Sequence, residues 1–239
     1  EMLNYPKYKC LNIHGSLLPQ LRGAVPVPMA ILQGLEETGV TIQRMVNEMD
    51  KGPVLQITNY KLKVNETSES LMHELAKIGA DLIAQLLPDW VEGKIQEKDQ
   101  DESRATYCYK EEIAKEKAEI KFDTDVNLAE RMIRAFYPWP IAWIKLQIKN
   151  EKLKMNNKIA DETKGEVKVL KIYRAKLYQP NEHIIQEGKE KRKEISLRRV
   201  GKSLVLDLEN GSLELLEVQL EGKRRDSAKN YLFLAEKDE

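Results

Sequence analysis

The sequence lacks several features that would each point to a class of protein. Its 239 residues carry 39 basic and 39 acidic side chains, so there is no net charge to bind nucleic acid through bulk attraction. No run approaches the roughly 18 apolar residues that a membrane-spanning helix needs. Two cysteines alone cannot build a disulfide framework or a zinc site. A chain that is 41% hydrophobic and 33% charged is typical of a globular protein, which we expect to be cytoplasmic with reduced thiols.

The first 95 residues show patterns of both strands and helices. Alternating apolar residues predict three strands, at 10–14, 38–46 and 54–62. Apolar residues at helical spacing predict a short helix over 25–32, where Pro26 and Pro28 suit only the first turn. The same spacing predicts a long amphipathic helix that begins near Thr67. Strands and helices in this order are typical of an α/β domain.

The pattern changes in the second half of the chain. Residues 96–116 are mostly polar and charged, which indicates a linker between domains. A short helix is predicted over 127–135, and a closing helix over 228–234. Between them lie five short β-like runs, at 141–148, 165–178, 194–200, 203–210 and 211–220. Several short strands at close spacing favour a small β-barrel over residues 117–239.

Positive charge is concentrated in one part of this second region. Residues 145–202 hold 17 basic and 8 acidic side chains, a net charge of +9, with Tyr173 and Tyr178 among them. Such a stretch is a candidate surface for a phosphate backbone. The alternative is a solvated, lysine-rich surface without a partner, and charge alone does not separate the two.

The most informative part of the first region is a polar pair at the end of a predicted strand. Asn12 and His14 are two residues apart, so on a strand their side chains point to the same face. An Asn amide can donate to an oxygen that gains negative charge, and His can carry a proton near neutral pH. Asp50 follows a strand expected to neighbour theirs, where a carboxylate could orient the imidazole. The alternatives are a structural His–Asn pair and an ordinary turn aspartate before Gly52.

A longer motif surrounds these residues. It reads Asn12-x-His14-x-Ser16-Leu17-Leu18-Pro19-x-x-Arg22-Gly23-Ala24-x-Pro26. The motif resembles the active-site signature of the 10-formyltetrahydrofolate-dependent formyltransferases, and residues 37–42 with Asp50-x-Gly52 are similar to the same family. Two further stretches resemble the second domain of the branch that formylates methionyl-tRNA, namely Ile133-Arg134-Ala135-Phe136-x-Pro138-Trp139-Pro140 and Val218-Gln219-x-x-Gly222-Lys223.

The resemblance implies a reaction and a role for individual residues. A formyl group would pass from 10-formyltetrahydrofolate to the α-amine of methionyl-initiator tRNA, without a metal. Asn12, His14 and Asp50 would be the catalytic residues. The residues that would line the tetrahydrofolate site are Ser16, Leu17, Leu18 and Pro19. Candidate contacts to the tRNA are Lys191, Arg192, Lys193, Arg198 and Arg199.

The resemblance also implies a fold and a domain plan. Residues 1–95 would be the C-terminal part of a Rossmann-like formyltransferase domain, residues 96–116 a linker, and residues 117–239 an OB-like β-barrel that binds tRNA. The family's catalytic domain has several strands and helices before this motif, whereas only residues 1–11 precede Asn12. We therefore expect an N-terminally truncated, monomeric and poorly active enzyme. Two alternatives stay open: a sugar-nucleotide amine formyltransferase and a non-catalytic RNA-binding remnant.

Overall fold

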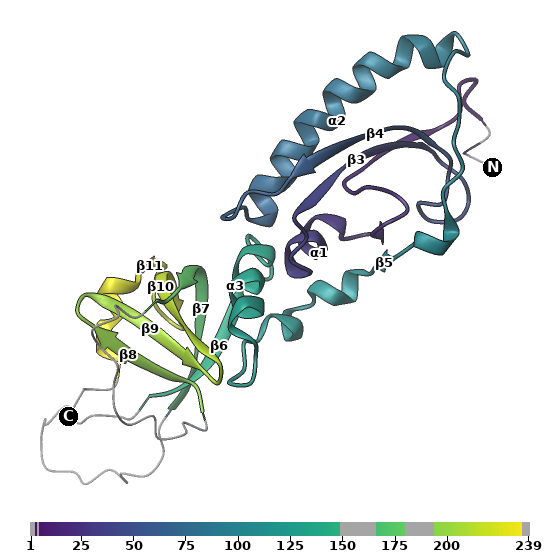
Figure 1. Cartoon of the computed structure of the whole chain (residues 1–239). Helices are drawn as coiled ribbons and strands as arrows, with labels where there is room; N and C mark the ends of the chain where they lie inside the picture. Colours follow the sequence, from purple (N-terminus) through teal and green to yellow (C-terminus); the bar gives the residue numbers. More distant parts are fainter. Residues whose placement is uncertain (1–2, 4, 149–165, 180–193, 236–239) are drawn as a thin grey trace, which may run out of the picture. The chain divides into compact units, whose positions relative to one another are not determined.

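The computed structural model describes residues 3, 5–148, 166–179 and 194–235, which form two compact units (Figure 1). The first unit comprises residues 1–117 and 134–140, and the second comprises residues 118–133 and 141–239. Each unit has its own main sheet. The functional division at residues 95 and 117 stays a prediction.

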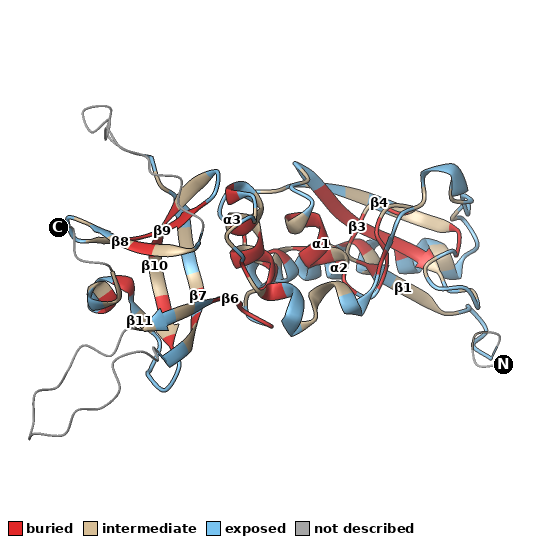
Figure 2. Cartoon of the chain, turned by 90° about the horizontal axis from the view of Figure 1, so that it is seen from below, coloured by how far each residue is buried: buried red, intermediate tan, exposed pale blue. Residues whose placement is uncertain are grey.

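A three-stranded sheet forms the centre of the first unit. Strand β3 (Glu37–Arg44) lies between β1 (Leu11–His14) and β4 (Val54–Lys61), and both pairs are antiparallel. Six consecutive residues of β3 are buried, so this strand is covered on both faces (Figure 2). β1 and β4 lie within the segments that alternation predicts, and β3 begins one residue before its predicted segment and ends two residues before that segment's end, so the three predicted strands are confirmed.

Two helices pack in this unit. Helix α1 (Pro26–Leu32) carries its prolines in the first turn, as predicted. Helix α2 (Ser68–Val91) begins after Thr67, whose hydroxyl accepts a hydrogen bond from the backbone N–H of Ser70. Four leucines of α2 are buried against β3 residues in one core, each contributing about 1.5–3 kcal/mol by its burial. These are Leu71, Leu75, Leu82 and Leu86.

Residues 97–108, expected as part of a linker, run along the first unit instead. Backbone hydrogen bonds of 2.8 and 2.9 Å join Lys98 to Val54 in both directions. Farther along, β5 (Tyr107–Cys108) pairs in parallel with β2 (Arg22–Gly23). Short 3-10 helices flank this pair, at Glu102–Arg104, Lys110–Ile113 and Lys115–Ala118. The segment is therefore an attached part of the unit. The two cysteines of the chain, Cys10 and Cys108, are free thiols.

An antiparallel sheet dominates the second unit and curls around its core (Figure 1). In pairing order its strands are β6 (Ala142–Ile148), β7 (Glu166–Leu177), β10 (Gly211–Leu220), β9 (Ser203–Leu208) and β8 (Ser196–Val200), with β11 (Asp226–Ser227) beside β10. The five predicted β runs are thus confirmed. Leu170, Ile172 and Leu213 are fully buried, because alternate residues of β7 and β10 face the core there, whereas β9 is buried over five consecutive residues.

The predicted helices of the second half also form. Helix α3 (Val126–Ala135) begins after Asp125, whose carboxylate accepts hydrogen bonds from the backbone N–H groups of Asn127 and Leu128. The closing helix at Ala228–Leu234 is a 3-10 helix with a kink at Tyr231. In the part of the chain that the structure describes, no helix combines the length and apolar character needed to cross a bilayer.

Candidate active site

The carboxylate of Asp50 is the centre of a polar cluster at one end of the first sheet. Its Oδ1 lies 2.8 Å from Nε2 of Gln43, 3.4 Å from Nδ2 of Asn12 and 3.6 Å from Nδ1 of His14. Its Oδ2 accepts a 2.8 Å hydrogen bond from the backbone N–H of Gly23. The cluster therefore joins β1, β2 and β3 to the loop that carries Asp50.

The register of β1 and β3 explains why these side chains meet. Asn12 pairs with Gln43 and His14 pairs with Thr41, so all four lie on one face of the two strands. Ile13, between them, points the other way and is 46% exposed. The two-residue spacing predicted Asn12 and His14 on one face beside the strand before Asp50, and the structure confirms that geometry.

His14 has both ring nitrogens engaged. Its side chain is buried, and Nε2 lies 2.9 Å from the carbonyl oxygen of Leu21. A carbonyl only accepts hydrogen bonds, so Nε2 carries a proton and donates it. Nδ1 then faces the Asp50 carboxylate. The hydrogen bond to the main chain thus fixes the orientation of the ring beside the carboxylate.

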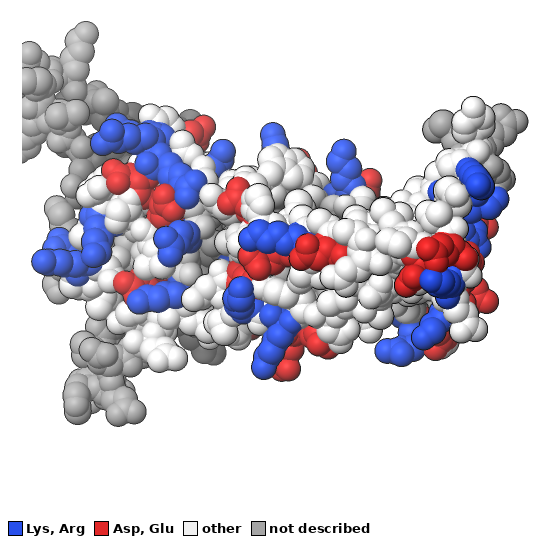
Figure 3. Space-filling view, turned by 90° about the horizontal axis from the view of Figure 1, so that it is seen from above, with Lys and Arg blue, Asp and Glu red and all other residues white. Residues whose placement is uncertain are grey.

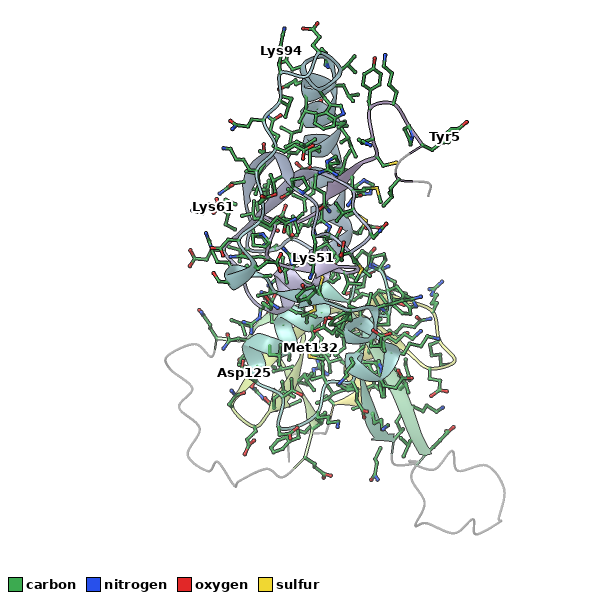
Figure 4. The ribbon with its side chains drawn as sticks, turned by 90° about the vertical axis from the view of Figure 1, so that its right-hand side faces the viewer. Tyr5, Lys51, Lys61, Lys94, Asp125 and Met132 are labelled. Atoms are coloured by element: carbon green, nitrogen blue, oxygen red, sulfur yellow. The ribbon has the colours of Figure 1, made fainter. Side chains whose placement is uncertain are left out.

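The loop that carries Asp50 has a constrained backbone. Asp50 has φ of +56°, in the left-handed region that Asp tolerates better than most residues. Two residues on, a Cβ at Gly52 would lie 1.6 Å from the carbonyl oxygen of Arg44. Only glycine permits this close approach. Lys51, between them, is labelled in Figure 4 and marks the loop.

A hollow of about 200 Å³ opens beside the carboxylate. Its lining is Asn12, Gln43 and the loop residues Met45, Val46, Asn47, Glu48, Met49 and Asp50. Sites that enclose drug-sized ligands usually measure about 300–1,000 Å³, so this hollow suits a small reacting group better than a whole folate. Asn12 and Asp50 line this hollow, whereas His14 is buried and is not part of the lining.

The four residues predicted to line a folate site form a tight turn. The hydroxyl of Ser16 donates to the carbonyl of Gln20 and is buried. The backbone N–H of Leu18 donates to the hydroxyl of Thr41, and Leu18 is buried as well. Leu17 and Pro19 are half-buried, which leaves their side chains as the ones partly open to a ligand. A folate-binding role for the four stays a prediction.

Two of the five predicted tRNA contacts lie on β8, and they differ in their surroundings. Arg198 is half-buried, with Nε 2.8 Å from Oδ2 of Asp207 and its guanidinium over the ring of Tyr178. Arg199 is exposed and donates to the carbonyl of Gly201. Lys191, Arg192 and Lys193 fall outside the described residues. Figure 3 shows basic and acidic side chains interspersed over the face it draws.

Gln43 is a site residue that the sequence argument missed. It is 2% exposed, it donates to Asp50, and its Oε1 has no hydrogen-bond partner among the described residues. A signal was present, because Thr41 and Gln43 put two polar side chains on the same face of the strand, next to the apolar Val40 and Ile42 on the other face. Across the described ranges no cluster of His, Cys, Asp and Glu could hold a metal ion.

Two family models match the chain. The formyl transferase model matches residues 1–87, and the model of the formyl transferase C-terminal domain matches residues 112–233, more than half of the chain. The chain belongs to the formyl transferase family. The resemblance noted in the motif around Asn12 and His14 is thereby confirmed, and so is the expected class of fold.

Curated relatives carry a more specific name. The methionyl-tRNA formyltransferase of Methylococcus capsulatus is 36% identical over 231 residues, which cover 97% of this chain and 66% of that protein. The methionyl-tRNA formyltransferase of Bacillus cytotoxicus is 39% identical over 146 residues, which cover 61% of this chain and 46% of that protein. The matches thus span about half to two-thirds of these relatives' length.

Solved structures of other proteins share the architecture. The N-formyltransferase from Helicobacter canadensis, solved with folinic acid and dTDP-3-aminofucose, superposes with a TM-score of 0.60 at 19% identity, covering 87% of this chain and 65% of that one. HypX from Aquifex aeolicus, solved with tetrahydrofolic acid, gives a TM-score of 0.62 at 16% identity, covering 93% and 34%. At these identities the likeness shows the fold alone.

Proposed function

We propose that this chain serves the transfer of a formyl group from 10-formyltetrahydrofolate to the α-amine of methionyl-initiator tRNA. The observation that carries the proposal is the convergence of Asn12 and His14 on the Asp50 carboxylate, within 3.4 and 3.6 Å, beside a hollow sized for a small group. The 36% identity to a methionyl-tRNA formyltransferase over 97% of the chain supports this acceptor. The enzyme would act in the cytoplasm, as a monomer, in translation initiation.

Each of the three residues has a role that its position permits. The amine would attack the formyl carbon of the folate donor, and the formyl oxygen would gain negative charge. The bond from that carbon to the folate nitrogen would then break, and tetrahydrofolate would leave as its nitrogen takes up a proton. Asn12 lines the hollow, and its Nδ2 carries two N–H groups. One of them donates to Oδ1 of Asp50 at 3.4 Å, so the other remains to donate to the formyl oxygen. Asp50 would accept a proton from the attacking amine, and His14 would share that proton through Nδ1.

The remaining predicted contacts belong to the same proposal. Leu17 and Pro19 would touch the folate, while Ser16 and Leu18 would hold their turn in shape through the hydrogen bonds described above. In the second unit, the exposed Arg199 would contact tRNA phosphates directly. Arg198 would contribute to the same tRNA surface while it stays paired with Asp207. Phosphate contacts of this kind position a tRNA without reading its sequence.

A formylation assay with three acceptors tests the proposal. The chain would receive 10-formyltetrahydrofolate with initiator methionyl-tRNA, with an amino-sugar nucleotide, or with no acceptor. We expect turnover with methionyl-tRNA alone. Turnover with the sugar nucleotide would replace the proposed acceptor, and tRNA binding without any turnover would indicate an RNA-binding protein instead.

A further inference from the structure

Arg22 is a buried charge that the proposed reaction does not use. It has no exposed surface and does not line the hollow. A guanidinium has five N–H donors, and here they make five hydrogen bonds. Two go to Oε1 of Gln100, two to the carboxylate of Glu102 and one to the hydroxyl of Tyr107. The hydrogen bond to Glu102 raises the pKa of Arg22 and lowers the pKa of Glu102, so both stay charged near neutral pH.

Gln100 connects this buried charge to the loop of Asp50. Its Nε2 donates to the main-chain carbonyl oxygens of Asp50, at 2.8 Å, and of Gly52, at 2.7 Å. Arginine has only donors, so the amide oxygen of Gln100 must face Arg22 and its nitrogen must face the loop. The orientation of this side chain is therefore fixed from both ends.

The opposite side of Asp50 is held by the residue next to Arg22. The backbone N–H of Gly23 donates to Oδ2 of the carboxylate at 2.8 Å. Arg22 and Gly23 are in turn fixed by their parallel pairing with Tyr107 and Cys108. The short strand β2 thus contacts the Asp50 loop in two ways. The backbone N–H of Gly23 holds the carboxylate, and Arg22 holds the Gln100 amide that binds the main chain of the loop.

We propose that Gln100 is the positioning residue for Asp50, with Arg22 as the buried charge that orients it. Gln100 acts through the loop, and its two hydrogen bonds keep Asp50 at its left-handed φ, with the carboxylate directed at Asn12 and His14. The catalytic consequence rests on the proposed function. The positioning itself does not, because it is a statement about where one carboxylate lies.

The substitution Gln100→Glu tests the contact with the loop separately from the contact with Arg22. A carboxylate still accepts from Arg22, but it presents an oxygen instead of an N–H to the carbonyls of Asp50 and Gly52. The matched control is Glu102→Gln, which alters another Arg22 partner whose side chain forms no hydrogen bond with the loop and interacts with it only through the charge of Lys51. Both variants would be made in the whole chain.

The first readout needs no substrate. The backbone N–H of Gly23 and the side-chain amide of Gln43 both donate to the Asp50 carboxylate, so their nuclear magnetic resonance signals report its position. We expect Gln100→Glu to move both signals most of the way toward their positions in Asp50→Ala, and Glu102→Gln to move them little. Unchanged signals in Gln100→Glu would overturn the proposal.

The second readout is the split between kcat and KM in the formylation assay. A misplacement of about 1 Å can cost about 10²-fold in rate, so we expect kcat to fall by about that factor with the KM for tRNA unchanged. Should Gln100→Glu not fold, Gln100→Met removes the same donor without adding charge and must give the same result. Moved signals without formyl transfer to any acceptor in the wild-type protein would sink the proposed function and leave the positioning intact.

Discussion

The two units of this chain use charged side chains differently. In the first unit the polar contacts converge, since Arg22, Gln100 and the N–H of Gly23 all hold one loop, and Arg22 is fully buried. In the second unit the ion pairs are spread along neighbouring strands and remain partly exposed. They include Arg198–Asp207, Lys176–Glu214 and Arg225–Glu217.

This difference predicts how each unit responds to substitution. Where contacts converge on one carboxylate, the loss of a single contact moves the group on which chemistry depends. Where pairs are distributed over a surface, each contributes little, because exposed ion pairs are typically worth about 0–1 kcal/mol. Large effects are therefore expected in the first unit, and small, graded effects in the second.

The largest effect should come from the centre of the cluster. Replacement of Asp50 by Asn keeps the shape of the side chain but removes the carboxylate that would take a proton, and we expect formyl transfer to methionyl-tRNA to fall by about 10³-fold. His14→Ala should cost a similar factor. Single-turnover rates with saturating tRNA measure both. Since neither residue lies in the second unit, tRNA binding should persist, and a near-wild-type rate in either variant would remove that residue from catalysis.

A smaller loss is expected from the loop backbone alone. A methyl group at Gly52 would meet the carbonyl oxygen of Arg44, so Gly52→Ala must shift the loop and displace Asp50. We expect a fall in kcat of about 10²-fold. The matched control is Gly93→Ala, because no atom lies within 4 Å of a Cβ built at Gly93. Gly93 has a positive φ, which alanine adopts at a cost, so Gly93→Ala should lower the stability of the fold without changing the rate.

Most of the fold follows from patterns that are local in the sequence. Alternation predicted the strands of both units, and the capping chemistry at Thr67 predicted the start of α2. The convergence of Asn12, His14 and Asp50 was also predictable, because it requires only the two-residue period of a strand and one neighbouring strand.

The role of residues 97–108 was not predictable in the same way. A polar, charged stretch reads as a linker when its partners are unknown, and the partners of Gln100 and Glu102 are 48 to 80 positions away in the sequence. The one hint was Arg22 itself, which lies in the motif but has no role in the implied chemistry. A charged residue next to apolar positions in a motif indicates a buried partner elsewhere in the chain.

In the second unit, Arg199 and Arg198 offer a direct test of distributed charge. Arg199 is exposed and Arg198 is tied to Asp207, so Arg199→Glu should weaken tRNA binding several-fold and lower the salt dependence of log K by about one unit. Binding titrations between low and moderate salt measure this. Lys61→Glu, an equal charge change on an exposed residue of β4, is the control. If it weakens binding as much as Arg199→Glu, net charge and not a defined surface is responsible.

The smallest expected effect is the loss of folding stability in acid that comes from Glu102 in the first unit. Hydrogen bonds from Arg22 hold the pKa of the Glu102 carboxyl below its ordinary value of 4.5. A carboxyl with a lowered folded-state pKa stabilises the fold at pH values above 4.5, and this contribution disappears as the pH falls through the lower folded-state value. The glutamine of Glu102→Gln does not titrate, so the stability difference between wild type and variant should be constant above pH 5 and shrink toward pH 3.

Urea denaturation at a series of pH values measures this difference in the first unit. Unfolding is followed by the fluorescence of Trp90, with Trp139 and Trp143 replaced by Phe. A difference that stays constant down to pH 3 would show that the Arg22–Glu102 pair contributes no charge-dependent stability.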